Sequence, residues 1–288
     1  MRWRFRGYDR ELGAMADALV MGVVNTTPDS FSDGGRHLEP ERAIAHALAL
    51  VDQRADVLDV GGESTRPGAD PVDADTEIAR VVPVVRALAP RIGVPISVDT
   101  HKAVVAKAAL EAGARIVNDV SALGEPGMAE VVCRAGAGLV LMHMRGTPST
   151  MQSGDLSSSD IVAEVCEVLA ERLQLALDAG IEPDAVVLDP GIGFGKTQAQ
   201  NLALLNGLDR LVALGRPVLV GVSRKSLIGH LTGRPVEARL AGSLGGALGA
   251  LHRGARILRV HDVAETRDAL RVMLAVLGDG ARDGLSHA

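Results

Sequence analysis

Aromatic residues are scarce in this sequence: Phe, Trp and Tyr together make up 2% of its 288 residues. Hydrophobic residues still make up 47%, so we expect a core of Val, Leu, Ile and Ala, the residues that fill parallel sheets and their covering helices. No apolar run approaches the roughly 18 residues of a membrane span, and no apolar signal core follows the basic amino terminus. The sequence therefore predicts a chain without a membrane segment.

Cysteines and charge runs are also sparse. The two cysteines, Cys133 and Cys166, lie in segments with helical patterns, and we expect buried free thiols in a reducing cytoplasm. The formal net charge is −6 without a long run of one sign, so nucleic acid is not an expected partner. No cluster has the spacing of a zinc site, and His143 lacks a Cys or His partner nearby, which favours a core histidine over a metal ligand.

Runs typical of strands alternate with helical patterns along nearly the whole chain. Strands are predicted at 18–25, 56–61, 95–100, 115–120, 138–144, 185–189, 217–223 and 255–262. Helices are predicted at 40–55, 74–91, 102–113, 160–180, 197–214, 238–253 and 265–277. This alternation indicates an α/β protein with a parallel sheet, either a single-domain TIM (β/α)8 barrel or a doubly wound open sheet. The barrel would occupy residues 18–280, between an amino-terminal extension, 1–17, and a carboxy-terminal tail, 281–288.

Polar residues decide between the two folds. They stand at or near the carboxyl ends of eight successive predicted strands: Asn25, Asp59, Asp99, Asn118, His143, Asp189, Ser223 and His261. In a barrel those ends converge on one mouth, which is where barrel enzymes place their chemistry, whereas an open sheet would spread them along an edge. The pattern therefore favours the barrel.

Two loops with turn-forming residues follow the first two predicted strands. NTTPDSFSDGG, from Asn25 to Gly35, is either a lid at the barrel mouth or an ordinary connection. DVGGESTRPGA, from Asp59 to Ala69, turns at its glycines and carries Thr65 and Arg66, which can bind an anion. A glycine-rich turn with one solvated arginine is the alternative, and the presence of two such loops after neighbouring strands weakens it.

Three strand ends suggest a pocket for a polar heterocycle. Asp99, Asn118 and Asp189 each end an apolar strand, which in any single case is explained by capping of the next helix. Three caps need not face a common pocket, and a heterocycle with N–H and amino donors needs such acceptors in an apolar cleft. Lys225, after the seventh strand, is either solvated or a donor to a carbonyl or anion in the mouth.

The eighth strand carries Arg259 and His261, which are two residues apart and therefore point to the same side. A barrel interior is normally apolar, so a buried Arg and His need an anionic partner, and barrels often bind phosphate near the loops after strands seven and eight. The alternative is that both side chains face the outer helices. We favour an anion site at the mouth.

LDPGIGFGKT, from Leu188 to Thr197, resembles a phosphate-binding P-loop. A P-loop needs four residues between its first glycine and the Gly-Lys pair, whereas three separate Gly191 from Gly195 here. A P-loop is therefore not predicted. The nucleophile elbow G-x-S-x-G is absent as well, since Ser223 lies in GVSRK.

The motifs MGVVNTTPDSFSDGG, DVGGESTRPGA, SVDT, VND, LMHM, LDPGIGFGK, GVSRKS and RVHD follow one another over roughly residues 20–280. Together they resemble the bacterial dihydropteroate synthases, pterin-binding enzymes of folate biosynthesis. The resemblance implies a transferase that condenses 6-hydroxymethyl-7,8-dihydropterin diphosphate with 4-aminobenzoate to give 7,8-dihydropteroate and diphosphate. It further implies Mg2+ as cofactor, a homodimer, a cytoplasmic location and inhibition by sulfonamides.

The resemblance also assigns residues to the parts of the site. The implied pterin set is Asp59, Asp99, Asn118, Met142, Asp189 and Lys225. The implied aminobenzoate set is Phe31, Thr65, Arg66, Pro67, Phe194, Ser223 and Lys225, so Lys225 belongs to both sets. Diphosphate would contact Asn25, Thr65, Arg66, Arg259 and His261, and Asn25 would also be the magnesium ligand. The implied catalytic residues are Asp99, Lys225, Arg259 and His261.

Two other functions share part of this pattern. A pterin-binding barrel that transfers a methyl group from a reduced folate to a corrinoid would keep the pterin residues, but it should lack PDSFSDGG and STRPG, which are present here. A non-catalytic pterin-binding paralogue should have lost Lys225, Arg66 or the loops, and none is lost. We therefore expect the synthase.

Overall fold

The computed structural model describes residues 1–27, 39–66, 68–153 and 155–278, and its centre is one sheet of eight parallel strands. In chain order these are β3 (Leu19–Asn25), β4 (Val57–Gly61), β5 (Ile96–Asp99), β6 (Ile116–Asp119), β7 (Gly138–Met142), β8 (Val186–Asp189), β9 (Leu219–Val220) and β10 (Ile257–Val260). Their spatial order is β8-β7-β6-β5-β4-β3-β10-β9, and a parallel bridge between Leu188 and Val218 joins the two ends. The sheet closes on itself, so the prediction of a TIM barrel is confirmed.

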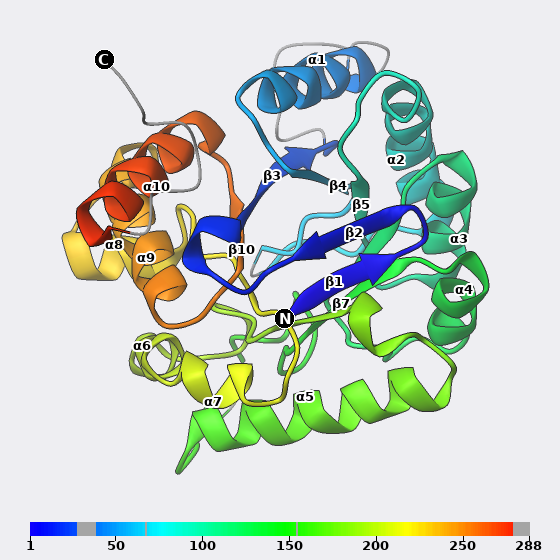
Figure 1. Ribbon diagram of the computed structural model, residues 1–288. Helices are drawn as coiled ribbons and strands as arrows, with labels where there is room; N and C mark the ends of the chain where they lie inside the picture. Colours follow the sequence, from blue (N-terminus) through cyan, green and yellow to red (C-terminus); the bar gives the residue numbers. More distant parts are fainter. Residues whose placement is uncertain (28–38, 67, 154, 279–288) are drawn as a thin grey trace.

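Helices cover the outside of the barrel (Figure 1). They are α1 (Glu39–Asp52), α2 (Ala74–Leu88), α3 (Ala103–Ala112), α4 (Met128–Ala135), α5 (Ile161–Asp178), α6 (Gln198–Asn206), α7 (Leu208–Val212), α8 (Ser226–Thr232), α9 (Leu240–His252) and α10 (Val263–Leu277). Val, Leu, Ile and Ala dominate the buried cluster between strands and helices, as expected. In the part of the chain that the structure describes, no helix is both long and apolar enough to span a membrane.

Local signals explain where several helices begin. Asp73 accepts a hydrogen bond from the Thr76 amide at the start of α2, and Asp160 accepts from two amides at the start of α5. Thr197 and Gln200 form a reciprocal capping box at the start of α6. The predicted helix at 197–214 is instead two helices, α6 and α7, which meet at Gly207. Both helices lie near α5 in Figure 1.

The cysteines lie on the helices predicted for them. Cys133 is on α4 and Cys166 is on α5, and both are free thiols. Each is half-buried rather than fully buried.

Residues 1–17 contain a β-hairpin that the sequence patterns did not indicate, formed by β1 (Arg2–Phe5) and β2 (Tyr8–Glu11). Trp3 is fully buried and donates a 3.1 Å hydrogen bond from Nε1 to the carbonyl of Ala185, directly before β8. The rings of Trp3, Phe5 and Tyr8 pack together, so three of the five aromatic residues lie in this hairpin. The hairpin lies across the end of the barrel where the strands begin (Figure 1).

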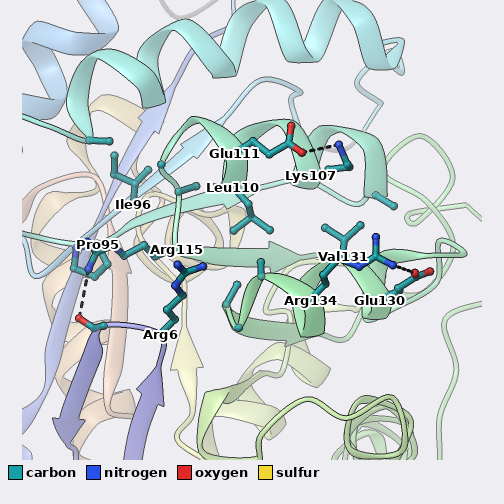
Figure 2. A pocket seen from close by; sticks show the side chains of 18 of the residues that line it. Arg6, Pro95, Ile96, Lys107, Leu110, Glu111, Arg115, Glu130, Val131 and Arg134 are labelled. Carbon is teal, nitrogen blue, oxygen red and sulfur yellow. Dashed lines mark hydrogen bonds and ion pairs between the residues drawn. The ribbon is translucent and has the colours of Figure 1, made fainter.

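A cavity of about 940 Å³ lies beside this hairpin, among the segments that lead into β5, β6 and β7 (Figure 2). Its floor includes Ile96 and Leu110. Among its charged side chains, Lys107 pairs with Glu111 and Arg134 pairs with Glu130 within their own helices. These four charges are satisfied without a ligand, and the cavity lies at the opposite end of the barrel from the polar strand ends.

Candidate active site

Four polar side chains from four strands form one connected cluster inside the barrel mouth. Arg259 on β10 donates from Nε to Oδ2 of Asp59 at 2.6 Å and from Nη2 to Oδ2 of Asp99 at 2.8 Å. Asn118 on β6 donates from Nδ2 to the same Asp59 oxygen at 3.0 Å. The strand ends therefore converge as predicted, and Arg259 points inward rather than toward the outer helices.

Arg259 already has its anionic partners within the chain. The expectation that its buried charge needs a bound anion was wrong in this respect, because the two carboxylates of Asp59 and Asp99 supply the compensation. Burial lowers the pKa of Arg259, but these two neighbours outweigh it and the net shift is upward. The guanidinium therefore stays charged and is oriented by two strands before any substrate arrives.

Burial raises the pKa of Asp99 to about 7, although the charge of Arg259 opposes the shift and that of Asp59 reinforces it. Oδ1 of Asp59, Asp99 and Asn118 is buried in each case and has no hydrogen-bond partner among the residues that the structure describes. Buried acceptors without partners are rare in native proteins. Three of them in one hydrogen-bonded cluster suit a ligand with several N–H donors.

Asp189 and Lys225 interact with this cluster through their charges. Asp189 is 6% exposed and its Oδ1 accepts a 2.7 Å hydrogen bond from the Gly191 amide. Burial raises the pKa of Asp189, and the charge of Lys225 opposes the shift. Burial lowers the pKa of Lys225 to about 8. Lys225 Nζ donates to the carbonyl of Ile192 and lies 4.5 Å from the ring centroid of Phe194, a cation–π contact.

His261 and Ser223 lie together beside Arg259. Ser223 Oγ is 3.0 Å from His261 Nδ1 and accepts a 3.3 Å hydrogen bond from the His261 amide. Burial lowers the pKa of His261 to about 4, and the positive charges of Arg259, Arg224 and Arg66 act in the same direction. Ser223, which the resemblance assigned to the aminobenzoate side, thus lies against the implied diphosphate residue His261.

Arg66 lies on the loop after β4, and its charge contributes to the lowered pKa of His261 after β10. Arg66 is exposed and Thr65 is half-buried. Phe31 and Pro67 lie outside the described residues. Asn25 is half-buried at the end of β3, and the described residues contain no group of three His, Cys, Asp or Glu side chains that could hold a metal ion.

The sequence did not predict an ionic cluster that holds the base of the loop after β4. Lys102 Nζ lies 2.5 Å from Oε2 of Glu63 and 2.6 Å from Oε2 of the fully buried Glu77. The other oxygen of Glu63 accepts a 3.0 Å hydrogen bond from the amide of Val72, so the carboxylate ties both ends of the loop together. Glu63 stands inside GGESTRPG, and a charged residue between two glycines and the turn was the available signal.

We expect Glu63→Gln to loosen the loop after β4 and to destabilise the fold. The amide can still accept from Val72, but the charge opposite Lys102 is lost, and a hydrogen bond between charged groups contributes about 1.5–3 kcal/mol. The free energy of unfolding should fall by about 1.5–3 kcal/mol, measured by denaturant titration. Glu111→Gln, at the exposed partner of Lys107, is the matched control; equal effects in both variants would contradict the anchoring role.

Comparison with known proteins relates this chain to pterin-binding enzymes. The family described as pterin binding enzyme matches residues 21–261, which include the carboxyl ends of all eight strands of the barrel. The fold and this match define the chain as a pterin-binding barrel enzyme.

Relatives within this class narrow the assignment. The dihydropteroate synthase of Escherichia coli is 46% identical over 258 residues, which cover 90% of this chain and 91% of that protein. A Xanthomonas albilineans dihydropteroate synthase solved with 4-aminobenzoic acid is 49% identical, with a TM-score of 0.89, and covers 96% of this chain and 98% of its own. The Yersinia pestis dihydropteroate synthase solved with a sulfonamide drug has a TM-score of 0.89 at 42% identity, over 96% and 100% of the two chains. This chain belongs to the dihydropteroate synthase family of folate-synthesis transferases.

Proposed function

We propose that the barrel mouth binds 6-hydroxymethyl-7,8-dihydropterin diphosphate and 4-aminobenzoate and condenses them to 7,8-dihydropteroate and diphosphate. The bond between the pterin methylene and the diphosphate oxygen breaks, and the arylamine nitrogen forms the new bond to that carbon. The amine proton then leaves to diphosphate or water. The observation that carries this proposal is the set of three buried acceptors without partners around Arg259.

We assign the pterin to these acceptors and their neighbours. The pterin ring carries N–H and amino donors, which complement Oδ1 of Asp59, Asp99 and Asn118. Asp189 supplies a further carboxylate, Met142 at the end of β7 a buried apolar surface, and Lys225 a donor for the ring carbonyl.

We assign the diphosphate arm to the end of β10 and the neighbouring loops. His261 lies beside Arg259, and both Arg66 and Arg224 carry positive charge close to it. Thr65 precedes Arg66 on the loop after β4 and adds a hydroxyl donor. Positive groups aimed at the departing diphosphate stabilise the charge that develops in the transition state.

Magnesium fits this assignment through Asn25. An amide oxygen is a hard ligand of the kind that Mg2+ takes, and magnesium sites on phosphates draw most of their ligands from the phosphate oxygens and water. A single protein ligand at the end of β3 is therefore compatible with the lack of a three-residue acidic cluster in the described segments. When bound, the ion neutralises the diphosphate leaving group.

The negative charge of Asp99 favours the positive charge left on the pterin methylene as the diphosphate departs. No strong base is needed before attack, because an arylamine is neutral at pH 7. We place the aminobenzoate beside Phe194, Lys225 and the loop that holds Thr65, Arg66 and Pro67, with Ser223 and Phe31 completing that side. Pro67 and Phe31 belong to this set by family resemblance alone.

We further propose that this chain acts as a cytoplasmic homodimer whose barrel domain spans 18–280, flanked by residues 1–17 and 281–288. The glycines of α9 would allow another subunit to pack closely against this helix. A side chain at Gly242 or Gly246 would press on Ile228 or Val222 of the same chain, whereas Gly245 and Gly249 have nothing within 4 Å. The second pair leaves a flat helix face that a partner subunit could approach closely.

Inhibition by sulfonamides tests the aminobenzoate assignment. A sulfonamide carries the same arylamine as aminobenzoate, so we expect it to inhibit competitively against 4-aminobenzoate and not against the pterin diphosphate. Initial rates at several concentrations of each substrate distinguish these patterns. A protein that turns over aminobenzoate yet ignores sulfonamide would contradict the assignment.

A further inference from the structure

The lysine of the loop that resembles a P-loop points into its own backbone. Lys196 is 2% exposed, and its Nζ donates to the carbonyls of Gly191 at 2.9 Å, Phe194 at 2.9 Å and His143 at 3.2 Å. An ammonium has three donors, and all three are used. Two of the acceptors belong to the loop after β8, and the third lies at the end of β7.

The glycines of this loop allow it to lie directly on the end of β7. Gly191 has a φ of +65°, and a Cβ there would lie 1.9 Å from the carbonyl oxygen of His143. A Cβ on Gly195 would lie 2.6 Å from the Cβ of Arg145. The loop therefore contacts the neighbouring strand at main-chain distance, and the ammonium of Lys196 bridges the two.

The same loop surrounds the side chain of Lys225. The carbonyl of Ile192 accepts from Lys225 Nζ, and the ring of Phe194 lies 4.5 Å from that nitrogen. A Cβ on Gly193 would lie 3.5 Å from Cδ of Lys225. Three consecutive loop residues thus fix the position of one lysine.

The two lysines also share a carboxylate. Burial lowers the pKa of Lys196 to about 7, Asp189 raises it, and the charge of Lys225 lowers it further. The charge of Asp189 also raises the pKa of Lys225. Lys196 is therefore linked to Lys225 by the loop backbone and by the common field of Asp189.

We propose that Lys196 is a positioning residue, which clamps the loop after β8 onto the end of β7 and thereby holds Lys225 where it meets the pterin. This inference rests on the proposed role of Lys225 in pterin binding. Lys196 itself touches no substrate, because its three donors are already used within the protein.

A double-mutant cycle on the full-length protein tests the coupling. The affinity for 6-hydroxymethylpterin, which lacks the diphosphate arm, is measured by calorimetric titration for the wild type, Lys196→Met, Lys225→Met and the double variant. Lys196→Met should weaken binding about tenfold in the wild-type background and less than about twofold in the Lys225→Met background, because residues acting through one group are not additive. Lys107→Met, at an exposed lysine of α3, should leave the affinity unchanged.

The outcomes separate this inference from the proposed function. If Lys225→Met weakens binding but Lys196→Met does not, or if the two losses add, the positioning role is wrong while the pterin assignment stands. If Lys225→Met leaves the affinity unchanged, the pterin-binding role of Lys225 and the positioning role of Lys196 are both wrong. Should Lys196→Met not fold, as judged by circular dichroism, the cycle is run with Lys196→Gln, which keeps two N–H donors on a shorter stem.

Discussion

Asp99→Ala should lower kcat/KM for the condensation by about 10²–10³-fold while the protein stays folded. The carboxylate is 7% exposed, its Oδ2 lies 2.8 Å from Nη2 of Arg259, and in the proposed reaction its charge stabilises the cation that forms on the pterin. Losing it removes both an acceptor for the ring and the charge that stabilises the transition state. Steady-state rates measure the loss of kcat/KM, and a thermal melt of the same preparation shows whether the variant is folded.

The matched control for this variant is Asp268→Ala, at an exposed carboxylate on α10 for which we propose no part in the site. Its rates should stay within about twofold of wild type. A substitution at an exposed position outside the core and the site usually changes the free energy of unfolding by no more than about 0.5 kcal/mol. Near-normal activity in Asp99→Ala would remove this residue from the catalytic set.

Arg259→Ala should reduce the free energy of unfolding by about 3–5 kcal/mol, because it leaves the buried carboxylates of Asp59 and Asp99 without their cation. It should also weaken diphosphate binding about ten- to a hundredfold, with a smaller loss for a bare pterin, since a hydrogen bond between charged groups contributes about 1.5–3 kcal/mol. Denaturant titration and calorimetry measure these effects.

Arg134→Ala, at an exposed arginine of α4, is the matched control and should leave stability nearly unchanged. If Arg259→Ala weakens the binding of diphosphate and of a bare pterin equally, the arginine belongs to the pterin pocket or to the scaffold. Unchanged stability would mean that the pairs with Asp59 and Asp99 do not form in solution.

The barrel was predictable because its signal is periodic. Each short β-branched run ends in a polar residue, and eight such ends imply a common mouth once the strands are parallel. The hairpin at residues 2–11 lacked this signal, since its packing depends on Trp3 reaching a carbonyl 182 residues away. Its position across the start of the barrel follows only from the closed sheet.

The positions of the polar side chains at the strand ends were easier to predict than their partners. Asp59, Asp99 and Arg259 were identified from their places at strand ends, but their ion pairs join residues 200 and 160 positions apart. No local pattern encodes that pairing, so the argument from an unpaired arginine failed. The P-loop comparison indicated no role for Lys196, because spacing alone does not show that a lysine can bind the backbone of its own loop.

The central claim is tested most directly by turnover of the purified protein. 6-Hydroxymethyl-7,8-dihydropterin diphosphate, 4-aminobenzoate and Mg2+ are mixed with it, and 7,8-dihydropteroate and diphosphate are quantified by chromatography. The account predicts that both products appear in equal amounts, that neither forms when 4-aminobenzoate is omitted, and that Asp99→Ala abolishes nearly all of both. A folded protein that binds the pterin but forms no dihydropteroate would contradict the account and favour a non-catalytic pterin-binding role.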